Sequence, residues 1–406
     1  MKILIVNQPL NNRGDESAHK ALIRKLIAEI PNASIEVLWV GEDDSTIAEM
    51  MVKDQSVTYT NLPKPCLWNL LTGTTLHYKL YVLWAILPFL KPLFSIYKKA
   101  DLVLCAPGGM CMGGFQNWCH LFFLQVAKYL GKKVAYYGRS IGPFPTDTPA
   151  KKRFKEISLD LLNYFSFISI RDMESEKLLS KLGIKCIPTV DTAFLDDTIE
   201  YLPKEVANII NPFYCVFVPN SLLWHPFFKG KLSEKQTFDF YSAILSAIQS
   251  RYNGITTVML PQTYNYGSGA DDINFFKKFA KFTNDKSIIV MSDKYSSDVQ
   301  QAIIKGAEFV CGARYHSVVF SINQHRPFIA LSYEHKIKGL LENLNCLNRM
   351  IDISDYSLLL EDKEIIKKKV LDILKMDDNI SCPTVLAKKI SNNCFNELKQ
   401  FILKLC

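Results

Sequence analysis

One segment combines a glycine, an arginine and a histidine at close spacing: Cys311-Gly312-Ala313-Arg314-Tyr315-His316-Ser317. It follows Phe309–Cys311, which has the pattern of a buried strand, and it opens a helical pattern. In a parallel sheet this places the segment at the carboxyl edge, where helix N-termini favour anions. Gly312 allows a tight turn, Arg314 suits a carboxylate or phosphate, and His316 can transfer a proton near neutral pH. We predict a functional role, the alternative being a histidine that is only part of the structural hydrogen bonding.

A second basic group follows the next strand along the chain. The run Phe328–Tyr333 is apolar and ends in Glu334-His335-Lys336. Two successive strands would then deliver Arg314, His316 and Lys336 to one edge, and three potential cations at one edge indicate an anionic substrate. For Lys336 alone, a solvated lysine in the first turn of a helix is an equally good interpretation.

The N-terminal half offers a matching set of residues at strand ends. Arg171 and Arg139 each follow an apolar run, and Gly108 and Gly109 follow another. Glycine-rich loops after strands are common in α/β proteins, so none of these indicates a function alone. Asp15 precedes the first helical pattern, where a helix N-cap is the structural alternative to a binding role.

Several enzyme classes are excluded because their motifs are missing. The chain has no GxGxxG after its first strand, no GxxxxGK[ST], no HExxH and no GxSxG, which argues against NAD, P-loop and serine-hydrolase chemistry. The spacing of Cys105, Cys111, Cys119 and the adjacent His120 fits no zinc module, so no zinc site is expected there. A basic edge without a P-loop suits a small phosphorylated carboxylic acid as donor.

The elements that must position these residues alternate between strand-like and helical patterns over most of the 406 residues. This predicts an α/β fold with doubly wound parallel sheets, as two Rossmann-like domains facing a cleft in a GT-B-like architecture. We expect an N-terminal domain over 1–195 and a C-terminal domain over 212–375. We expect a helical segment over 376–406 that packs back on the N-terminal domain.

Charge and the N-terminus bear on partners and compartment. Lys and Arg number 48 and Asp and Glu 40, a formal charge of +8, but the lysines are dispersed and form no arginine-rich arm. We therefore expect no nucleic acid partner. The segment Met1–Asn7 lacks the features of a signal peptide, which predicts a cytoplasmic protein, either free or peripheral at the inner face of the membrane.

An apolar insertion around 62–98 stands apart from the rest. Leu80–Leu90 is almost unbroken apolar sequence, and Lys91, Lys98 and Lys99 follow it. It is too short to span a bilayer, which takes about 20 residues. A helical insertion packed on the first domain is the favoured interpretation, and a membrane-facing patch with lysines at its rim is the alternative.

The order and spacing of short motifs resemble the polysaccharide pyruvyl transferases, from about residue 5 to about residue 340. The motifs are Gly14-Asp15, Pro107-Gly108-Gly109, Ser140-Ile141-Gly142-Pro143, Arg171-Asp172 with Ser175, Leu179 and Gly183, Asp191-Thr192-Ala193-Phe194, Leu260-Pro261-Gln262, Gly312-x-Arg314-x-His316, and Pro327–Tyr333 leading into Lys336 and Gly339. Met110, where a third glycine is common, and Arg139, where the family varies, are departures from the pattern.

The resemblance implies transfer of the pyruvyl group from phosphoenolpyruvate to a sugar, which forms a cyclic pyruvate ketal across two hydroxyls and releases phosphate. Phosphoenolpyruvate is then a donor substrate, and no further cofactor or metal is implied. The acceptor would be a sugar of a polysaccharide or of a lipid-linked glycan precursor, as in capsule and exopolysaccharide synthesis.

On this basis we predict catalytic residues, a donor site and an acceptor site. The predicted catalytic residues are His316, as general acid, and Arg314. The predicted donor-binding residues are Arg171, Arg314, His316, Lys336 and Gly312. The predicted acceptor-binding residues are Asp15, Gly108, Gly109, Arg139 and Gln262. Two other functions stay open: a GT-B glycosyltransferase that uses a nucleotide sugar, and a non-catalytic protein that binds a glycan or an anion.

Overall fold

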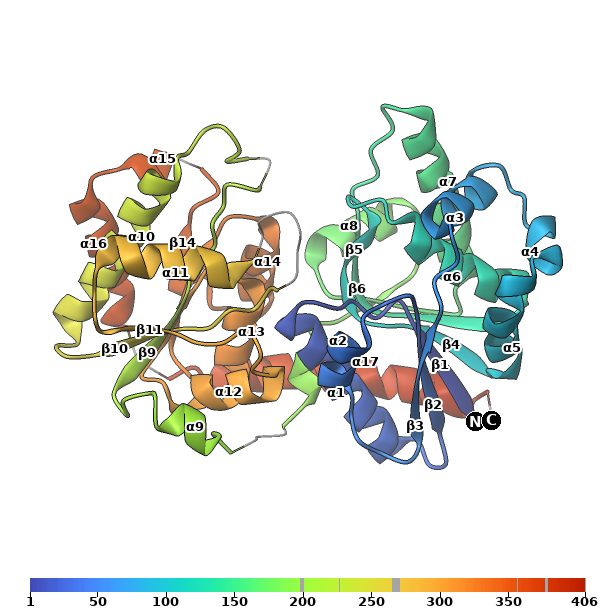
Figure 1. Cartoon of the computed structure of the whole chain (residues 1–406), viewed down its shortest axis with the longest axis horizontal. Coiled ribbons are helices and arrows are strands. Elements are labelled where there is room, and N and C mark those ends of the chain that lie inside the picture. The colour runs from blue at the N-terminus through green and yellow to red at the C-terminus, as the bar shows by residue number, and fades with distance from the viewer. Residues whose placement is uncertain (198–200, 226, 265–270, 356, 377–378, 406) are drawn as a thin grey trace. The chain divides into compact units, whose positions relative to one another are not determined.

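The computed structural model of the chain describes residues 1–406 except 198–200, 226, 265–270, 356, 377–378 and 406 (Figure 1). It divides into two compact units. The first unit comprises Met1–Leu10, Ala18–Asp196 and Lys389–Cys406, and the second comprises Asn11–Ser17 and Asp197–Lys388. The division therefore runs through two helices, α1 (Arg13–Glu29) and α17 (Ser381–Leu403).

The first unit is built on a parallel sheet with the strand order β3-β2-β1-β4-β6-β7-β8, to which β5 adds by pairing with β6. Its strands are β1 (Lys2–Val6), β2 (Ser34–Val40), β3 (Val57–Leu62), β4 (Leu102–Cys105), β5 (Gly108–Gly113), β6 (Lys133–Gly142), β7 (Phe167–Ile170) and β8 (Ile187–Pro188). Further helices are α2 (Asp44–Met50), α3 (Trp68–His77), α4 (Val82–Ile86), α5 (Lys91–Lys99), α6 (Trp118–Tyr129), α7 (Pro149–Tyr164) and α8 (Met173–Lys181), with 3-10 turns η1 (Pro88–Leu90) and η2 (Thr192–Leu195).

Two apolar clusters cover this sheet. One contains side chains of α3–α7, and the other contains side chains of α1 and α17, including Phe395 and Leu398. The central strands are buried on both faces, which explains their nearly continuous apolar sequence.

Two sequence predictions for this unit are corrected. Gly108 and Gly109 lie in a strand, β5, rather than in a loop. Arg139 does not follow a strand but lies within β6, which continues to Gly142 past a register shift between Tyr136 and Arg139 that contains Gly138 (φ +57°). The glycine thus marks a bulge within the strand, not its end.

The second unit has a six-stranded parallel sheet in the order β11-β10-β9-β12-β13-β14. Its strands are β9 (Tyr214–Val218), β10 (Thr256–Met259), β11 (Ile288–Val290), β12 (Val310–Gly312), β13 (Phe328–Ser332) and β14 (Met350–Asp352). Its helices are α9 (Lys204–Ala207), α10 (Glu234–Arg251), α11 (Asp272–Thr283), α12 (Ser297–Gly306), α13 (Tyr315–Asn323), α14 (His335–Asn343), α15 (Ser357–Leu360) and α16 (Lys363–Leu374), with the 3-10 turn η3 (Leu347–Arg349).

The predicted α/β class with two parallel sheets is confirmed. Each sheet reverses its strand order once, between β1 and β4 in the first and between β9 and β12 in the second. Ligands of doubly wound sheets bind beyond the carboxyl ends of the strands at such a reversal. In the second unit, a ligand is therefore expected to bind beside the residues that follow β9 and β12.

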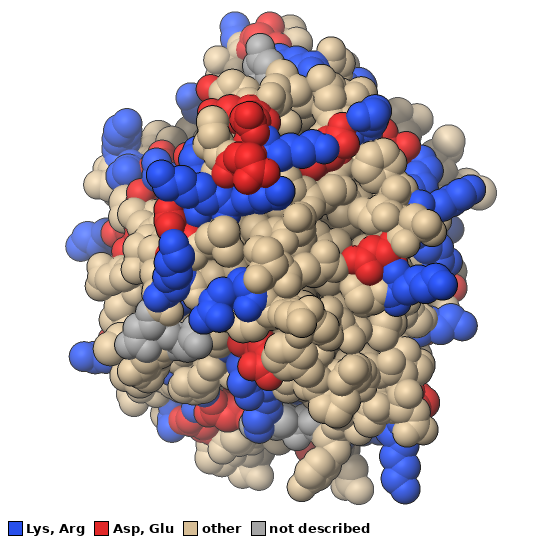
Figure 2. All heavy atoms as spheres, turned by 90° about the vertical axis from the view of Figure 1, so that its left-hand side faces the viewer, with Lys and Arg blue, Asp and Glu red and all other residues tan. Residues whose placement is uncertain are grey.

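Basic and acidic side chains are mixed, rather than gathered into patches of one sign, on the face that Figure 2 shows. Ion pairs on α10, α11 and α16 account for part of this mixing, for example Lys235–Asp239 at 2.6 Å and Lys278–Glu234 at 2.9 Å. None of the described helices is both long and apolar enough to cross a membrane.

Candidate active site

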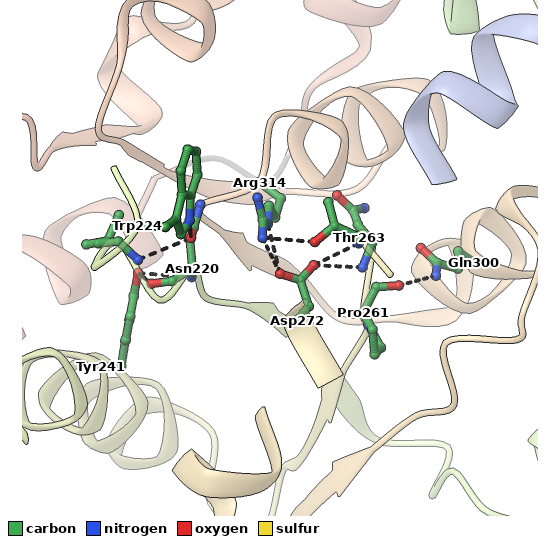
Figure 3. A network of polar contacts seen from close by, with 10 residues as sticks. Asn220, Trp224, Tyr241, Pro261, Thr263, Asp272, Gln300 and Arg314 are labelled. Atoms are coloured by element: carbon green, nitrogen blue, oxygen red, sulfur yellow. Dashed lines mark hydrogen bonds and ion pairs between the residues drawn. The ribbon is translucent and has the colours of Figure 1, made fainter. Parts of the chain in front are cut away.

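Arg314 and Asp272 form the centre of a polar network at the carboxyl edge of the second sheet (Figure 3). Arg314 follows β12, and its Nε donates to Asp272 Oδ1 at 3.0 Å while Nη2 donates to Thr263 Oγ1 at 3.0 Å. The Arg314 side chain is only 12% exposed, and that of Asp272 2%. Burial, the largest single effect, lowers the pKa of Arg314, but Asp272 together with Tyr333 and Tyr241 leaves the pKa raised. The guanidinium is therefore charged and held in one orientation.

Asp272 also fixes the loop that follows β10. As the first residue of α11, it accepts the backbone N–H groups of Gln262 (2.9 Å) and Thr263 (3.0 Å) through Oδ2. Gln300 holds the same loop by donating to the Pro261 carbonyl at 2.7 Å (Figure 3). One carboxylate thus ties the loop of β10 to the arginine of β12, so the edge is preorganised before any ligand binds.

His316 lies in the first turn of α13, two residues after Arg314, and is 7% exposed. Its ring packs directly on the backbone of Gly14. A Cβ at position 14 would lie 1.8 Å from His316 Nδ1 and 1.9 Å from Cγ. No side chain fits between the two, so the glycine at position 14 sets where the imidazole can be.

The segment Asn11–Ser17 brings Gly14 to this place. Arg13 and Glu16 form a buried ion pair at 2.8 Å, and Glu16 Oε1 accepts both the backbone N–H and the hydroxyl of Ser297 at 3.0 Å. The Arg13 guanidinium lies 4.3 Å from the centre of the Tyr264 ring. A buried charge pair tied by hydrogen bonds to α12 is costly to move, so it holds the start of α1 in the second unit.

Gly312 is required by packing. A Cβ there would come 1.9 Å from Ser317 Oγ, and that hydroxyl donates to the Arg314 carbonyl at 2.5 Å. The absence of a side chain at Gly312 therefore lets α13 pack closely on β12. The donor-binding role of Gly312 stays a prediction.

Lys336 is in the first turn of α14 and forms an ion pair with Glu334 at 3.2 Å. His225, which follows β9, is close enough to Lys336 and Glu334 for their charges to change its pKa. Burial lowers the pKa of His225, Lys336 lowers it further and Glu334 opposes them. The His225 ring also packs edge-on against Tyr333 at 5.5 Å. A second histidine thus joins the same sheet edge.

Gln262 is 2% exposed, and its Nε2 has no hydrogen-bond partner within the described residues. A buried amide with an unused donor is costly in a folded protein, unless a ligand accepts from it. Beside this edge lies an open cavity of about 630 Å³. The described residues that line it are Ser221, Leu223, Trp224, Lys229, Glu234, Asp271, Asn274, Phe275 and Lys278.

Arg171 belongs to the first unit, where it pairs with Asp191 at 2.5 Å; the Asp191 side chain is fully buried. Asp191 also accepts the backbone N–H of Ala193 at 3.0 Å. Next to it, Asp172 caps α8 by accepting from Ser175 N at 2.8 Å. These contacts give two of the quoted motifs a structural role. The donor-binding role of Arg171 stays a prediction.

Arg139 is fully buried and lies beneath the strand reversal of the first sheet. Its Nη1 donates to the carbonyls of Ala106 (2.6 Å) and Asn7 (3.2 Å), which follow β4 and β1. A Cβ on Gly108 (φ +155°) would lie 3.2 Å from its Nη2, whereas one on Gly109 would meet nothing within 4 Å. Arg139 therefore supports the Gly108 backbone from inside, and an acceptor role for it would act through that backbone.

The helix cap predicted as the alternative for Asp15 is wrong. Asn12 Oδ1 accepts the backbone N–H groups of Gly14 (2.8 Å) and Asp15 (3.3 Å), so Asn12 caps α1 and Asp15 lies in its first turn. Its acceptor-binding role stays a prediction.

The structure places six of the predicted residues in the second unit: Asp15, Gln262, Gly312, Arg314, His316 and Lys336. It places four in the first: Gly108, Gly109, Arg139 and Arg171.

Sequence reasoning missed four residues of the site. Asp272, His225 and Glu16 were not named, and Gly14 was named only within a family motif, although each is buried against a predicted residue or against the segment that carries one. Glu16, three residues after Arg13, gave a sequence signal, since this spacing allows an ion pair on a helix. Asp272 and His225 gave none, because only the fold brings them beside Arg314 and Lys336.

Comparison with known proteins gives the family. A sequence model described as polysaccharide pyruvyl transferase matches residues 12–335. The amylovoran biosynthesis protein AmsJ of Erwinia amylovora is 24% identical, over 87% of this chain and 88% of its own. The chain belongs to the polysaccharide pyruvyl transferase family.

Solved structures agree on the fold. The UDP-GlcNAc 2-epimerase of Methanocaldococcus jannaschii is similar with a TM-score of 0.60 at 13% identity, over 98% of this chain and 100% of that one. UGT2 of Phytolacca americana, complexed with UDP-2-fluoro-glucose and pterostilbene, is similar with a TM-score of 0.57 at 12% identity, over 98% and 99%. Both are GT-B fold enzymes, so the fold is GT-B-like. Among the described residues, no group of three or more His, Cys, Asp or Glu could hold a metal ion.

Proposed function

We propose that this transferase moves the pyruvyl group of phosphoenolpyruvate onto a sugar and closes it into a cyclic ketal. The observation that carries the proposal is the pairing of two groups at one sheet edge. Arg314 is held rigid by Asp272 and Thr263, and His316 follows it by two residues with its ring packed on Gly14. An oriented cation next to a proton donor suits a donor that is anionic and must be protonated.

The proposed chemistry has two steps. Arg314 binds the carboxylate or phosphate of phosphoenolpyruvate, and His316 gives a proton to its methylene carbon, which becomes a methyl group. A sugar hydroxyl forms a C–O bond to the cationic C2 and returns its proton to His316. A second hydroxyl of the same sugar then bonds to C2 as phosphate leaves with the electrons of the broken C–O bond. Phosphate takes up the second hydroxyl proton.

The remaining predicted residues have proposed positions in this scheme. Lys336 adds positive charge for the donor at the edge that carries Arg314, and a donor-binding role is proposed for Arg171 as well. Gln262 offers its unused Nε2 to a sugar oxygen. Asp15, Gly108 and Gly109 serve the acceptor, with Arg139 supporting the Gly108 backbone.

The acceptor is proposed to be a sugar of a polysaccharide or of its lipid-linked precursor. The family supports a sugar or polysaccharide acceptor, and the relative AmsJ carries amylovoran biosynthesis in its name. We propose that the protein works in the cytoplasm, where phosphoenolpyruvate is made.

The test is a donor and acceptor screen with the purified full chain. Phosphoenolpyruvate is offered with a panel of nucleotide-linked and lipid-linked hexoses, and phosphate release and product mass are measured. We expect phosphate release together with a product heavier than the acceptor by one pyruvate less one water. Nucleotide release from a sugar nucleotide, without phosphoenolpyruvate, would instead identify a glycosyltransferase. Binding of either donor without turnover for any acceptor would identify a binding protein.

A further inference from the structure

We infer that the insertion formed by α3, α4 and α5 is a docking surface for an anionic lipid membrane. The inner face of the insertion packs on the first unit. Its fully or nearly buried side chains are Trp68, Leu76, Trp84, Leu90, Leu93, Phe94 and Tyr97, all members of one apolar cluster. The structure thus confirms the predicted packing on the first domain. That packing accounts for only part of the insertion's apolar side chains.

The insertion also exposes many apolar side chains. Seven of the 21 exposed large apolar side chains among the described residues lie between positions 67 and 89: Leu67, Leu70, Tyr78, Leu80, Val82, Ile86 and Phe89. Val82 is 71% exposed and Ile86 68%. A helix that is apolar all round is normally buried on every side, so these exposed side chains call for a partner.

The charge of the insertion indicates which partner. No Asp or Glu occurs between Asp54 and Asp101, a stretch that contains five lysines, all exposed: Lys64, Lys79, Lys91, Lys98 and Lys99. Apolar side chains within a purely basic segment complement a bilayer with anionic headgroups. A second copy of the same surface would place lysines against lysines, which argues against self-association through it.

The outer side chains are also held in place. Trp84 is fully buried, and its ring contacts Phe122 at 5.0 Å and Tyr81 at 5.0 Å between ring centres. This anchors α4, which lies at the outer edge of the first unit beyond α6 (Figure 1). Val82 and Ile86 are four residues apart and therefore on one side of α4. They can enter the headgroup region without any rearrangement of the fold.

The experiment is co-sedimentation of the purified full chain with vesicles, without any substrate, so its result does not depend on the proposed reaction. Vesicles of phosphatidylglycerol with phosphatidylcholine are compared with phosphatidylcholine alone. We expect binding to the anionic vesicles, and a loss of about tenfold or more for Val82→Asp/Ile86→Asp, because apolar area is replaced by charge. Both positions are exposed, so the variant should melt like wild type. Ile365→Asp, an exposed apolar position in α16, is the matched control and should bind like wild type.

The lysines provide a second, independent variant. Lys91→Glu/Lys98→Glu/Lys99→Glu should weaken binding by at least about fivefold for each charge lost, and only on the anionic vesicles. The inference would be overturned if the wild-type protein does not bind the anionic vesicles. It would also be overturned if the Val82/Ile86 variant and the three-lysine variant both bind them as tightly as the wild-type protein does. Light scattering is run in parallel. A wild-type dimer that becomes a monomer in Val82→Asp/Ile86→Asp, without vesicle binding by wild type, would show that a second copy covers this surface instead.

Discussion

Gly14→Ala should damage catalysis through His316, because the new methyl group needs space that the imidazole occupies. The added Cβ would lie 1.8 Å from His316 Nδ1, whereas non-bonded heavy atoms pack at about 3.5–4.0 Å. The ring must therefore move by more than about 1 Å. A misplacement of that size costs roughly 10²-fold in rate, and loss of a general acid costs about 10²–10⁴-fold. We expect kcat to fall by about 10²–10³-fold.

The assay is steady-state phosphate release from phosphoenolpyruvate with the acceptor found in the screen. The Michaelis constant for phosphoenolpyruvate should change little, since Arg314 keeps its contacts with Asp272 and Thr263. Gly14 is a helical position, so alanine suits the backbone, and melting should confirm that the variant is folded. Gly73→Ala is the matched control: it is also helical, and its Cβ would meet only Trp118 at 4.0 Å.

A double variant tests the reasoning most directly. If Gly14 acts only by positioning His316, Gly14→Ala added to His316→Gln should cause little further loss of kcat. A folded Gly14→Ala enzyme with near-normal turnover would refute the argument, and so would two losses that multiply in the double variant.

Three further predictions concern His316, Arg314 and His19. His316→Gln should lower kcat by about 10²–10⁴-fold with little change in the Michaelis constant for phosphoenolpyruvate, and near-normal turnover in a folded variant would contradict the general-acid role. Arg314→Ala should weaken phosphoenolpyruvate binding by one to two orders of magnitude, with partial recovery in Arg314→Lys; calorimetric titration measures this. Arg314→Ala should also lower the melting temperature, because Asp272 loses its buried partner. Unchanged melting and unchanged phosphoenolpyruvate binding would show that the Arg314–Asp272 ion pair contributes neither to stability nor to the donor site. Burial lowers the pKa of His19 to about 3, with Lys20 adding to the effect, so the unfolded state binds the proton first as the pH falls below about 6.5. Urea unfolding should show His19 contributing a loss of about 1.4 kcal/mol per pH unit between about pH 6.5 and pH 3, and His19→Gln should reduce the slope by that amount.

Local sequence determined the type of most elements and where the predicted site residues lie along them. The apolar runs Phe309–Cys311 and Phe328–Tyr333 predicted β12 and β13 to within one residue at each end, because strands buried on both faces are continuous apolar runs. The same signal placed Arg314, His316 and Lys336 after β12 and β13, since a parallel sheet brings the carboxyl ends of its strands to one edge.

The secondary structure of the glycine-rich segments was harder to predict from sequence. Gly108 and Gly109 were expected in a loop and Arg139 after the end of a strand, because glycines beside strand ends are typical of turns, yet these residues lie in β5 and β6. Their strand conformation depends on pairing with each other, which is a contact between residues about 30 positions apart. Local sequence carries little information about such pairing.

Only the tertiary structure decided what surrounds the predicted residues. Asp272 is 42 positions from Arg314, and Gly14 is about 300 from His316, yet each fixes its partner's place. The sequence shows which groups can carry charge or a proton. Which carboxylate neutralises a guanidinium, and which missing side chain leaves room for an imidazole, depends on contacts between distant elements that form only when the sheet assembles.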